Sequence, residues 1–419
     1  MNRMIVAIPA GLIAGAIVGL MFGGLWLQWQ LGANMNSGNP FVLVTDFPGF
    51  RALRQDPWST AYLIVLGGAL VLALAGVVFS ITHRLTTYGT AHFQTKSEVK
   101  KNGLAQPIGS GLVYGKFGKP DLKNRTGRFV SGLYDLFPHA LVVAPTRSGK
   151  GVGYVIPNTL LFPGSCVVMD VKGEIFEATS RHRLAQGDKV FRFAPFDFEN
   201  PTFRYNPLER IAAIADTDQR FTELSKLASY FLVPKNEKGG ASDFIVGARQ
   251  LFVAAGMLAI ERNTPTIGAI SRILFGSGNK EKAYQRFATE TRHEQAATIF
   301  LNFSGYSDRT LSSYASVLDG AGLGLWLNPR IEKVTSANDF SWNDIRRHPH
   351  SIYIVAISDD IPTLAPLLRL IFGELIATMR SRIPDPKVEP WPVQIILDEF
   401  DQLGHMPIIV QSLKQLAGH

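Results

Sequence analysis

The fold of this chain is constrained most by two short motifs that lie far apart in the sequence. The first, Ala144-Pro-Thr-Arg-Ser-Gly-Lys-Gly151, begins at the end of the apolar run 140–144, and the second, Leu397-Asp-Glu-Phe400, begins at the end of the apolar run 393–397. Short apolar runs bounded by turn or charged residues are typical of buried strands. Both motifs are therefore predicted to follow a strand, and a glycine-rich loop in that position is typical of a phosphate-binding site.

The first motif differs from the usual phosphate-loop pattern, G-x-x-x-x-G-K-[ST], at both ends. Ala144 stands at the first position, where a small residue still permits the turn, and Gly151 replaces the residue whose hydroxyl normally contacts the metal. We expect the backbone N–H groups to surround a β-phosphate and the lysine to reach the β and γ oxygens; the alternative is a glycine-rich turn at a helix start. The residues predicted to contact nucleotide are Thr146, Arg147, Ser148, Gly149, Lys150, Gly151 and Val152.

Acidic residues follow two of the predicted strands. We expect Asp398 to hold magnesium through water and Glu399 to activate the attacking water, with Lys150 as the second catalytic residue. Asp170 ends the apolar run 166–170, where it is either a further magnesium ligand or a helix cap. The expected cofactors are therefore ATP and Mg²⁺.

Two apolar segments near the N-terminus are long enough to cross a membrane. Residues 4–27 contain no charged side chain and would form a helix of roughly 36 Å, and 61–82 repeat this pattern. Segment 83–128 carries nine Lys or Arg against two acids, whereas the charges of loop 28–60 balance. The positive-inside rule then predicts that both termini are cytoplasmic and that this loop is periplasmic.

Glycines recur every four residues in the first apolar segment and so fall on one helix face: Gly11, Gly15, Gly19 and Gly23. Such a glycine groove lets a second helix approach closely, which favours pairing with the second span or self-association. The alternative is the ordinary glycine richness of membrane helices.

The remaining chain alternates between strand and helix patterns, which predicts an α/β fold with a parallel sheet. Strands are expected at 140–144, 166–170, 189–193, 351–357 and 393–397. Between 209 and 335 the apolar residues repeat at helical spacing, and the apolar segment 244–260 is interpreted as a buried helix. The predicted divisions are an anchor at 1–83, a basic juxtamembrane segment at 84–130, a nucleotide-binding domain at 131–208 and 336–419, and an all-helical insertion at 209–335.

Taken together, these motifs resemble those of type IV secretion coupling proteins of the TraG type. The resemblance covers nearly all of the chain and is carried by the two apolar spans and by Pro145–Gly153, Met169–Glu174, Tyr205-Asn-Pro-Leu208 and Leu397–Phe400. It implies a P-loop NTPase fold like those of RecA and FtsK, with a helical insertion after two transmembrane helices. It also implies a homo-hexamer at the inner membrane that recruits relaxase or relaxosome DNA, or effector proteins, and drives them to the secretion channel by ATP hydrolysis.

The chain departs from that family at its C-terminal end. It stops at His419, 21 residues past Asp398, whereas relatives continue through a further strand. We therefore expect a truncated motor with an open apolar sheet edge and weaker hydrolysis. Two alternatives remain: a nucleotide-gated receptor or scaffold without productive hydrolysis, and an FtsK-like DNA translocase.

Overall fold

The computed structural model describes residues 2–32, 38–47, 49, 55–82, 92–117, 129–145, 147–233, 240–404 and 406–416. Thr146, predicted to contact nucleotide, and parts of loop 28–60 and of segment 84–130 lie outside these residues. The chain divides into two compact units, Met1–Thr95 and Lys96–His419.

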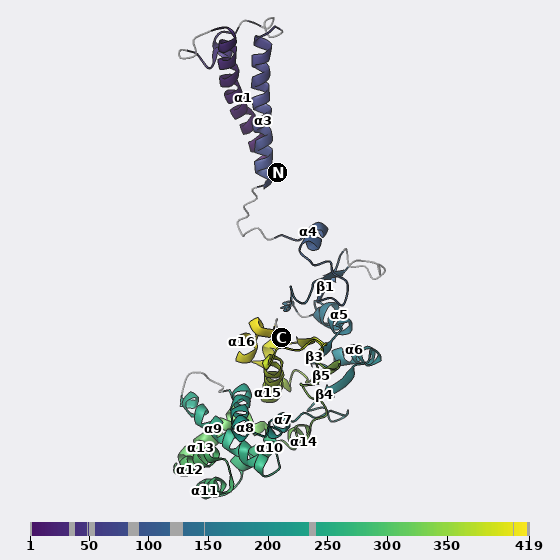
Figure 1. Cartoon of the computed structure of the whole chain (residues 1–419), viewed down its shortest axis with the longest axis vertical. Coiled ribbons are helices and arrows are strands. Elements are labelled where there is room, and N and C mark those ends of the chain that lie inside the picture. Colours follow the sequence, from purple (N-terminus) through teal and green to yellow (C-terminus); the bar gives the residue numbers. More distant parts are fainter. Residues whose placement is uncertain are drawn as a thin grey trace. The chain divides into compact units, whose positions relative to one another are not determined.

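The first unit is a helical hairpin formed by α1 (Asn2–Gln30) and α3 (Trp58–Thr82), with the short α2 (Val42–Thr45) at its turn (Figure 1). The glycines of α1 face the backbone of α3: a Cβ on Gly15 would lie 2.4 Å from the carbonyl oxygen of Gly68, and one on Gly11 2.7 Å from that of Leu72. The predicted glycine groove is therefore filled by the second apolar helix.

Among the described residues, four helices are long and apolar enough to cross a membrane, and they differ in burial. The apolar 18-residue stretches of α1 and α3 are 28% and 17% buried inside the structure, so most of their apolar surface is exposed. Those in α9 (Gly240–Glu261) and α15 (Ile361–Arg380) are each 61% buried. Because exposed apolar surface is costly in water, the first pair fits a lipid environment, whereas α9 packs inside the second unit as expected for 244–260.

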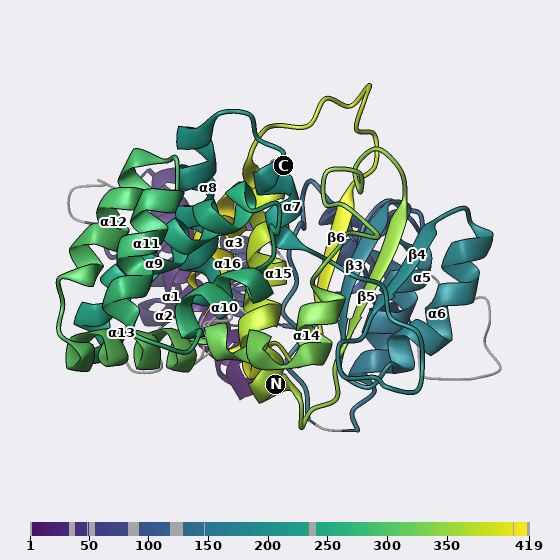
Figure 2. The same ribbon diagram turned by 90° about the horizontal axis from the view of Figure 1, so that it is seen from below.

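The second unit is built on a four-stranded parallel sheet in the order β4-β5-β3-β6 (Figure 2). Its strands are β3 (Ser165–Asp170), β4 (Lys189–Phe193), β5 (His350–Val355) and β6 (Val393–Leu397). These confirm four of the predicted strands and the α/β class. A separate antiparallel pair, β1 (Val113–Lys116) with β2 (Phe129–Ser131), and α4 (Lys96–Lys101) precede the sheet in the chain.

The predicted strand at 140–144 is wrong. The segment is irregular and makes no strand pairing among the described residues, and Leu141 and Val143 are 84% and 86% exposed. A strand exists only where a neighbour pairs its backbone groups, and β6 is paired on one side only within the described part of the sheet. Apolar content alone therefore did not produce a strand.

Side chains alternate between the two faces of the sheet, and both faces are buried. Cys166 and Val168 pack on one side beneath α5 (Ile156–Leu161) and α6 (Glu174–Ala185), in a cluster with Tyr353. Val167 and Met169 pack on the other side in one continuous core with the helices that follow β4. This burial on both faces is why the central strand β3 contains the apolar run Cys166–Met169.

An all-helical segment separates β4 from β5. Its helices are α7 (Pro207–Ala212), α8 (Thr217–Phe231), α9, α10 (Ile267–Phe275), α11 (Lys280–Glu290), α12 (Glu294–Ser304), α13 (Asp308–Ala321), a 3-10 turn η4 (Leu323–Leu327) and α14 (Pro329–Val334). Most begin at a residue whose side chain accepts a backbone N–H bond, which fixes where the helix starts. These capping residues are Asn206, Asp216, Thr266, Asn279, His293, Ser307 and Asn328.

Helix α15 lies between this helical segment and the strands (Figures 1 and 2). Its Glu374 is 1% exposed and accepts hydrogen bonds from the hydroxyl of Tyr205 and, at 3.2 and 3.1 Å, from the guanidinium of Arg210. Burial raises the pKa of Glu374, and the arginine opposes that effect. The Tyr205-Asn-Pro-Leu208 motif therefore serves packing: the tyrosine binds Glu374, the asparagine caps α7 and Leu208 is buried. After β6, η5 (Phe400–Leu403) and α16 (Pro407–Leu416) complete the described chain.

A bulky residue in the glycine groove should separate the hairpin helices. We expect Gly15→Ile to destabilise the first unit by about 1–3 kcal/mol because its side chain would overlap the α3 backbone. Gly67→Ile is the matched control, since a Cβ at Gly67 meets no atom within 4 Å. Thermal unfolding in detergent, read by protease cleavage of the first unit, checks this; equal loss in both variants would contradict the groove.

Candidate functional site

The carboxyl ends of β3 and β6 bring predicted site residues together. The two strands are parallel neighbours with Met169 opposite Leu397, so Asp170 and Asp398 lie at adjacent strand ends. Glu399 follows directly. The predicted acids thus lie at the same end of the sheet.

The glycine-rich loop leads into a helix that starts near the same edge. Only residues 162–164 connect α5 to β3, so α5 runs back along the sheet and the π-helical turn η3 (Gly151–Val155) lies toward the carboxyl ends of the strands. Gly149 has φ +87°, a conformation that favours glycine. Arg147, with φ 61°, is also left-handed, and the loop is exposed.

Pro157 shapes the helix after this loop in a way that differs from the simple kink expected for a mid-helix proline. The backbone N–H of Ile156 bonds the carbonyl of Gly151, five residues back, which is the π-helical pattern. Pro157 follows at the start of the regular α5, where its missing N–H costs little. The helix thus widens in the turn next to the loop.

Asn158 anchors this helix and was not found from the sequence. Its Oδ1 accepts from the N–H of Val113 and its Nδ2 donates to the carbonyl of Val113, both at 2.8 Å, while Nδ2 also reaches Tyr154 O at 2.8 Å. The side chain is buried. A lone asparagine in an apolar stretch was the available signal, but its partner lies 45 residues earlier.

Asp170 is held by the turn that follows β3. Its Oδ2 accepts the N–H of Phe176 at 2.7 Å, and the N–H groups of Ile175, Lys172 and Gly173 also favour the charged carboxylate. Burial outweighs them and raises the pKa of Asp170. This geometry matches the helix-capping alternative, and a role in metal binding stays a prediction.

Glu399 adopts an unusual backbone conformation. Its φ of 52° and ψ of 46° are left-handed, which costs a residue with a Cβ about 1–2 kcal/mol. Residues held in such conformations gather at functional sites. No group of three or more His, Cys, Asp or Glu that could hold a metal occurs in the described residues. Mg²⁺ needs only one or two carboxylates when phosphates and water supply the rest, so Asp170 and Asp398 at this edge fit it.

Residues 89–419 match the protein family described as Type IV secretory system Conjugative DNA transfer. The chain belongs to this family. The match covers both motifs, the sheet and the helical segment, and it confirms the resemblance stated from the sequence.

Curated relatives agree with membership of the conjugative DNA transfer family. The chain is 36% identical to Protein VirD4 of Agrobacterium fabrum and 39% identical to Protein VirD4 of Rhizobium rhizogenes, each over 100% of this chain and 61% of the relative. Conjugal transfer protein TraG of Escherichia coli is 26% identical over 86% of the chain and 61% of its own length. The chain thus spans 61% of the length of these relatives.

A solved structure shows a similar fold. Plasmid coupling protein TrwB, solved with the non-hydrolysable ATP analogue ADPNP, aligns with a TM-score of 0.53 and 16% identity over 79% of this chain and 72% of TrwB. The predicted P-loop NTPase fold is therefore confirmed.

Replacing Asn158 should loosen the helix that carries the loop. We expect Asn158→Leu to destabilise the second unit by about 1–3 kcal/mol or more, because the N–H and C=O of Val113 would be buried without partners. Asn302→Leu, at an exposed position of α12, is the control. Denaturant unfolding measures both, and equal midpoints would contradict the anchoring role.

The two loop glycines should respond differently to the same substitution. A Cβ at Gly151 meets no atom within 4 Å and φ is not positive there, so we expect Gly151→Ser to unfold at the wild-type temperature or slightly above it. Gly149→Ser should lower the midpoint because its φ of +87° is strained for serine. Differential scanning calorimetry compares them; a destabilised Gly151→Ser would show that the position is crowded.

Proposed function

We propose that the chain is an ATP-binding coupling protein of a type IV secretion system, anchored in the bacterial inner membrane, which recruits cargo and drives it to the secretion channel by ATP hydrolysis. The observation that carries this proposal is the position of Asp170, Asp398 and Glu399. They lie at the end of the sheet toward which the helix after the glycine-rich loop starts. Family membership and the fold shared with TrwB support it.

The residues of this edge fit a triphosphate and Mg²⁺. Gly149, Gly151 and Gly153 leave open space in which phosphate oxygens can approach the backbone. Lys150, the amides of Arg147–Gly151, and the flanking Thr146 and Val152 would contact the nucleotide. Asp398, and Asp170 as a further candidate, would hold Mg²⁺ through water, and the metal would neutralise phosphate charge. Glu399 would orient the attacking water and accept its proton.

The membrane arrangement follows from the hairpin and the charges around it. We place α1 and α3 across the membrane, the loop 28–60 in the periplasm and both termini in the cytoplasm. The basic segment 83–128 would contact anionic lipid. The division into an anchor, a juxtamembrane segment, a split nucleotide-binding domain and a helical insertion stays part of this proposal.

The proposed partners are further copies of the chain in a hexameric ring, components of the secretion channel, and relaxase or relaxosome DNA or effector proteins. The family description, conjugative DNA transfer, supports DNA as one cargo. DNA would be held through its phosphates, so its binding should weaken steeply as salt rises.

Lys150 should be required for nucleotide binding. We expect Lys150→Ala to weaken ATP affinity by roughly tenfold or more, because a charge-assisted contact to the phosphates is lost. Lys189→Ala is the matched control, since Lys189 is exposed at the opposite, amino end of β4. Titration with a fluorescent ATP analogue in detergent measures both, and equal affinity in the two variants would contradict the proposed loop.

Glu399 should separate binding from hydrolysis. We expect Glu399→Gln to bind ATP as the wild type does but to lose most phosphate release, because the amide cannot accept a proton. The comparison uses the same preparation at saturating ATP and Mg²⁺. If both proteins bind ATP and dock cargo equally well, and phosphate release does not depend on Glu399, the motor proposal is wrong. The chain would then be a nucleotide-gated receptor.

A further inference from the structure

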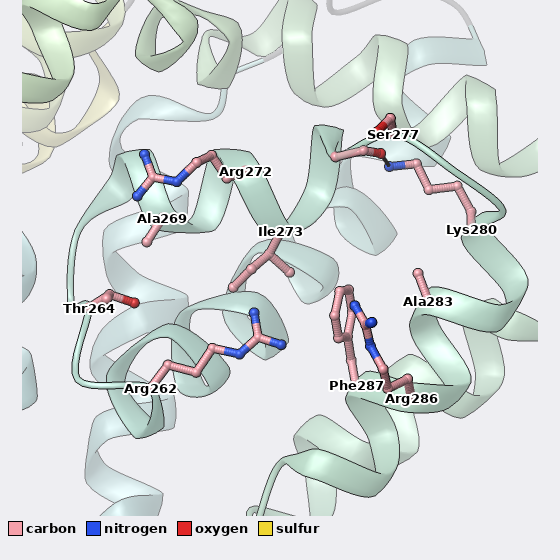
Figure 3. Close-up of a pocket in the computed structure, with 11 residues that line it drawn as sticks. Arg262, Thr264, Ala269, Arg272, Ile273, Ser277, Lys280, Ala283, Arg286 and Phe287 are labelled. Carbon is pink, nitrogen blue, oxygen red and sulfur yellow. Dashed lines mark hydrogen bonds between the residues drawn. The ribbon is translucent and has the colours of Figure 1, made fainter.

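A cationic pocket lies in the helical segment, away from the loop and the acidic strand ends in the sequence. It has a volume of about 320 Å³ and lies where the end of α9, the helix α10 and the helix α11 meet (Figure 3). Four of its lining residues are Arg262, Arg272, Lys280 and Arg286, and no acidic residue lines it. Pockets of this volume are large enough for a small polar group and its neighbours.

Two of the cations are partly neutralised from outside the pocket. Arg262 donates from Nε and Nη2 to the two carboxylate oxygens of Glu290 at 2.6 and 2.7 Å. Arg272 pairs with Glu332. The two-point contact with Glu290 fixes the direction of the Arg262 guanidinium group.

Within the described part of the chain, the other two cations have no carboxylate partner. Lys280 Nζ donates to the carbonyl oxygens of Leu274 and Gly276 at 2.7 and 2.6 Å, at the negative end of α10. No carboxylate lies within ion-pair distance of Arg286 among the described residues, although its charge lowers the pKa of the nearby Glu290. Four positive charges therefore face two negative ones.

A phenylalanine ring lies against two of these cations. The guanidinium carbons of Arg262 and Arg286 each lie 5.2 Å from the ring centroid of Phe287. Stacking on the ring orients both groups. Both guanidinium groups belong to residues that line the pocket, so an anion there would offset their charge.

We propose that this pocket binds a carboxylate side chain from an acidic segment of a cargo protein. The inference rests on the proposed function. It names one chemical group of the cargo, a carboxylate, that the helical segment would recognise. Planar guanidinium groups match a carboxylate in two-point contacts, and a lysine beside them adds charge.

The surroundings of the pocket favour a carboxylate over single-stranded nucleic acid. Phe287 is only 5% exposed, so it offers no surface on which a base could stack. Glu290 and Glu332 flank the pocket, and a strand that carries one negative charge per ~3.4 Å would meet both of them. One carboxylate among neutral residues avoids this repulsion.

The test uses a fluorescein-labelled peptide in which glutamates are spaced by glycine and serine. Fluorescence anisotropy measures its binding to the full chain in detergent. We expect Arg286→Gln to weaken its affinity by about tenfold and Arg286→Lys, which keeps the charge, to retain most of it. Arg309→Gln, at an exposed position of α13 outside the pocket lining, should bind as the wild type does. The same peptide with glutamine in place of glutamate should not bind detectably.

Three outcomes would overturn the inference: equal peptide affinity in wild type and Arg286→Gln, equal affinity for the glutamine peptide, or an Arg286-dependent loss confined to a single-stranded oligonucleotide. ATP titration of the same samples separates this test from that of the proposed function, since no pocket residue lies in the loop or at the strand ends. Intact Lys150-dependent ATP binding without peptide binding removes only the pocket proposal.

Discussion

The parallel pairing of β3 with β5 and β6 is the constraint on which the second unit depends. All six residues of β3 are buried, and both of its edges are hydrogen-bonded, to strands that occur far later in the chain. Closing such long loops costs chain entropy before any contact repays it. The helical segment reduces this entropy cost, because its folded helices return the chain compactly from the end of β4 to the start of β5.

The same pairing joins two regions that sequence patterns separate. One hydrophobic core runs from Val167 and Met169 through α15 into the helical segment. Glu374 adds a polar link, because a buried carboxylate must keep both Tyr205 and Arg210 in place. The helical segment is thus packed on the sheet as part of one structure, and the position of α15 is fixed from both sides.

Local patterns predicted what local forces decide. β4 and β6 have the expected bounds, and most helices between β4 and β5 start where capping side chains occur. The segment 140–144 failed because pairing depends on a neighbouring strand, which composition does not reveal. Pro157 follows a turn that is wider than a regular α-helical turn, and such a turn is set by backbone bonding that composition does not reveal.

The candidate site divides in the same way. The loop, Asp398 and Glu399 were visible as motifs, and register then placed Asp170 beside them. Asn158 and the four pocket cations were not predictable, because their partners come from distant parts of the chain. The choice between the two predicted partners of the glycine groove also needed the structure, since spacing gives a face but not the helix that covers it.

The irregular segment before the glycine-rich loop has a consequence for handling the protein. Leu141 and Val143 are exposed, and β6 offers unpaired backbone groups along its outer edge within the described sheet. An apolar stretch and an open strand edge together form a template for pairing between molecules. A charged residue at position 141 or 143 would oppose such pairing, because each added charge would have to be brought between the molecules.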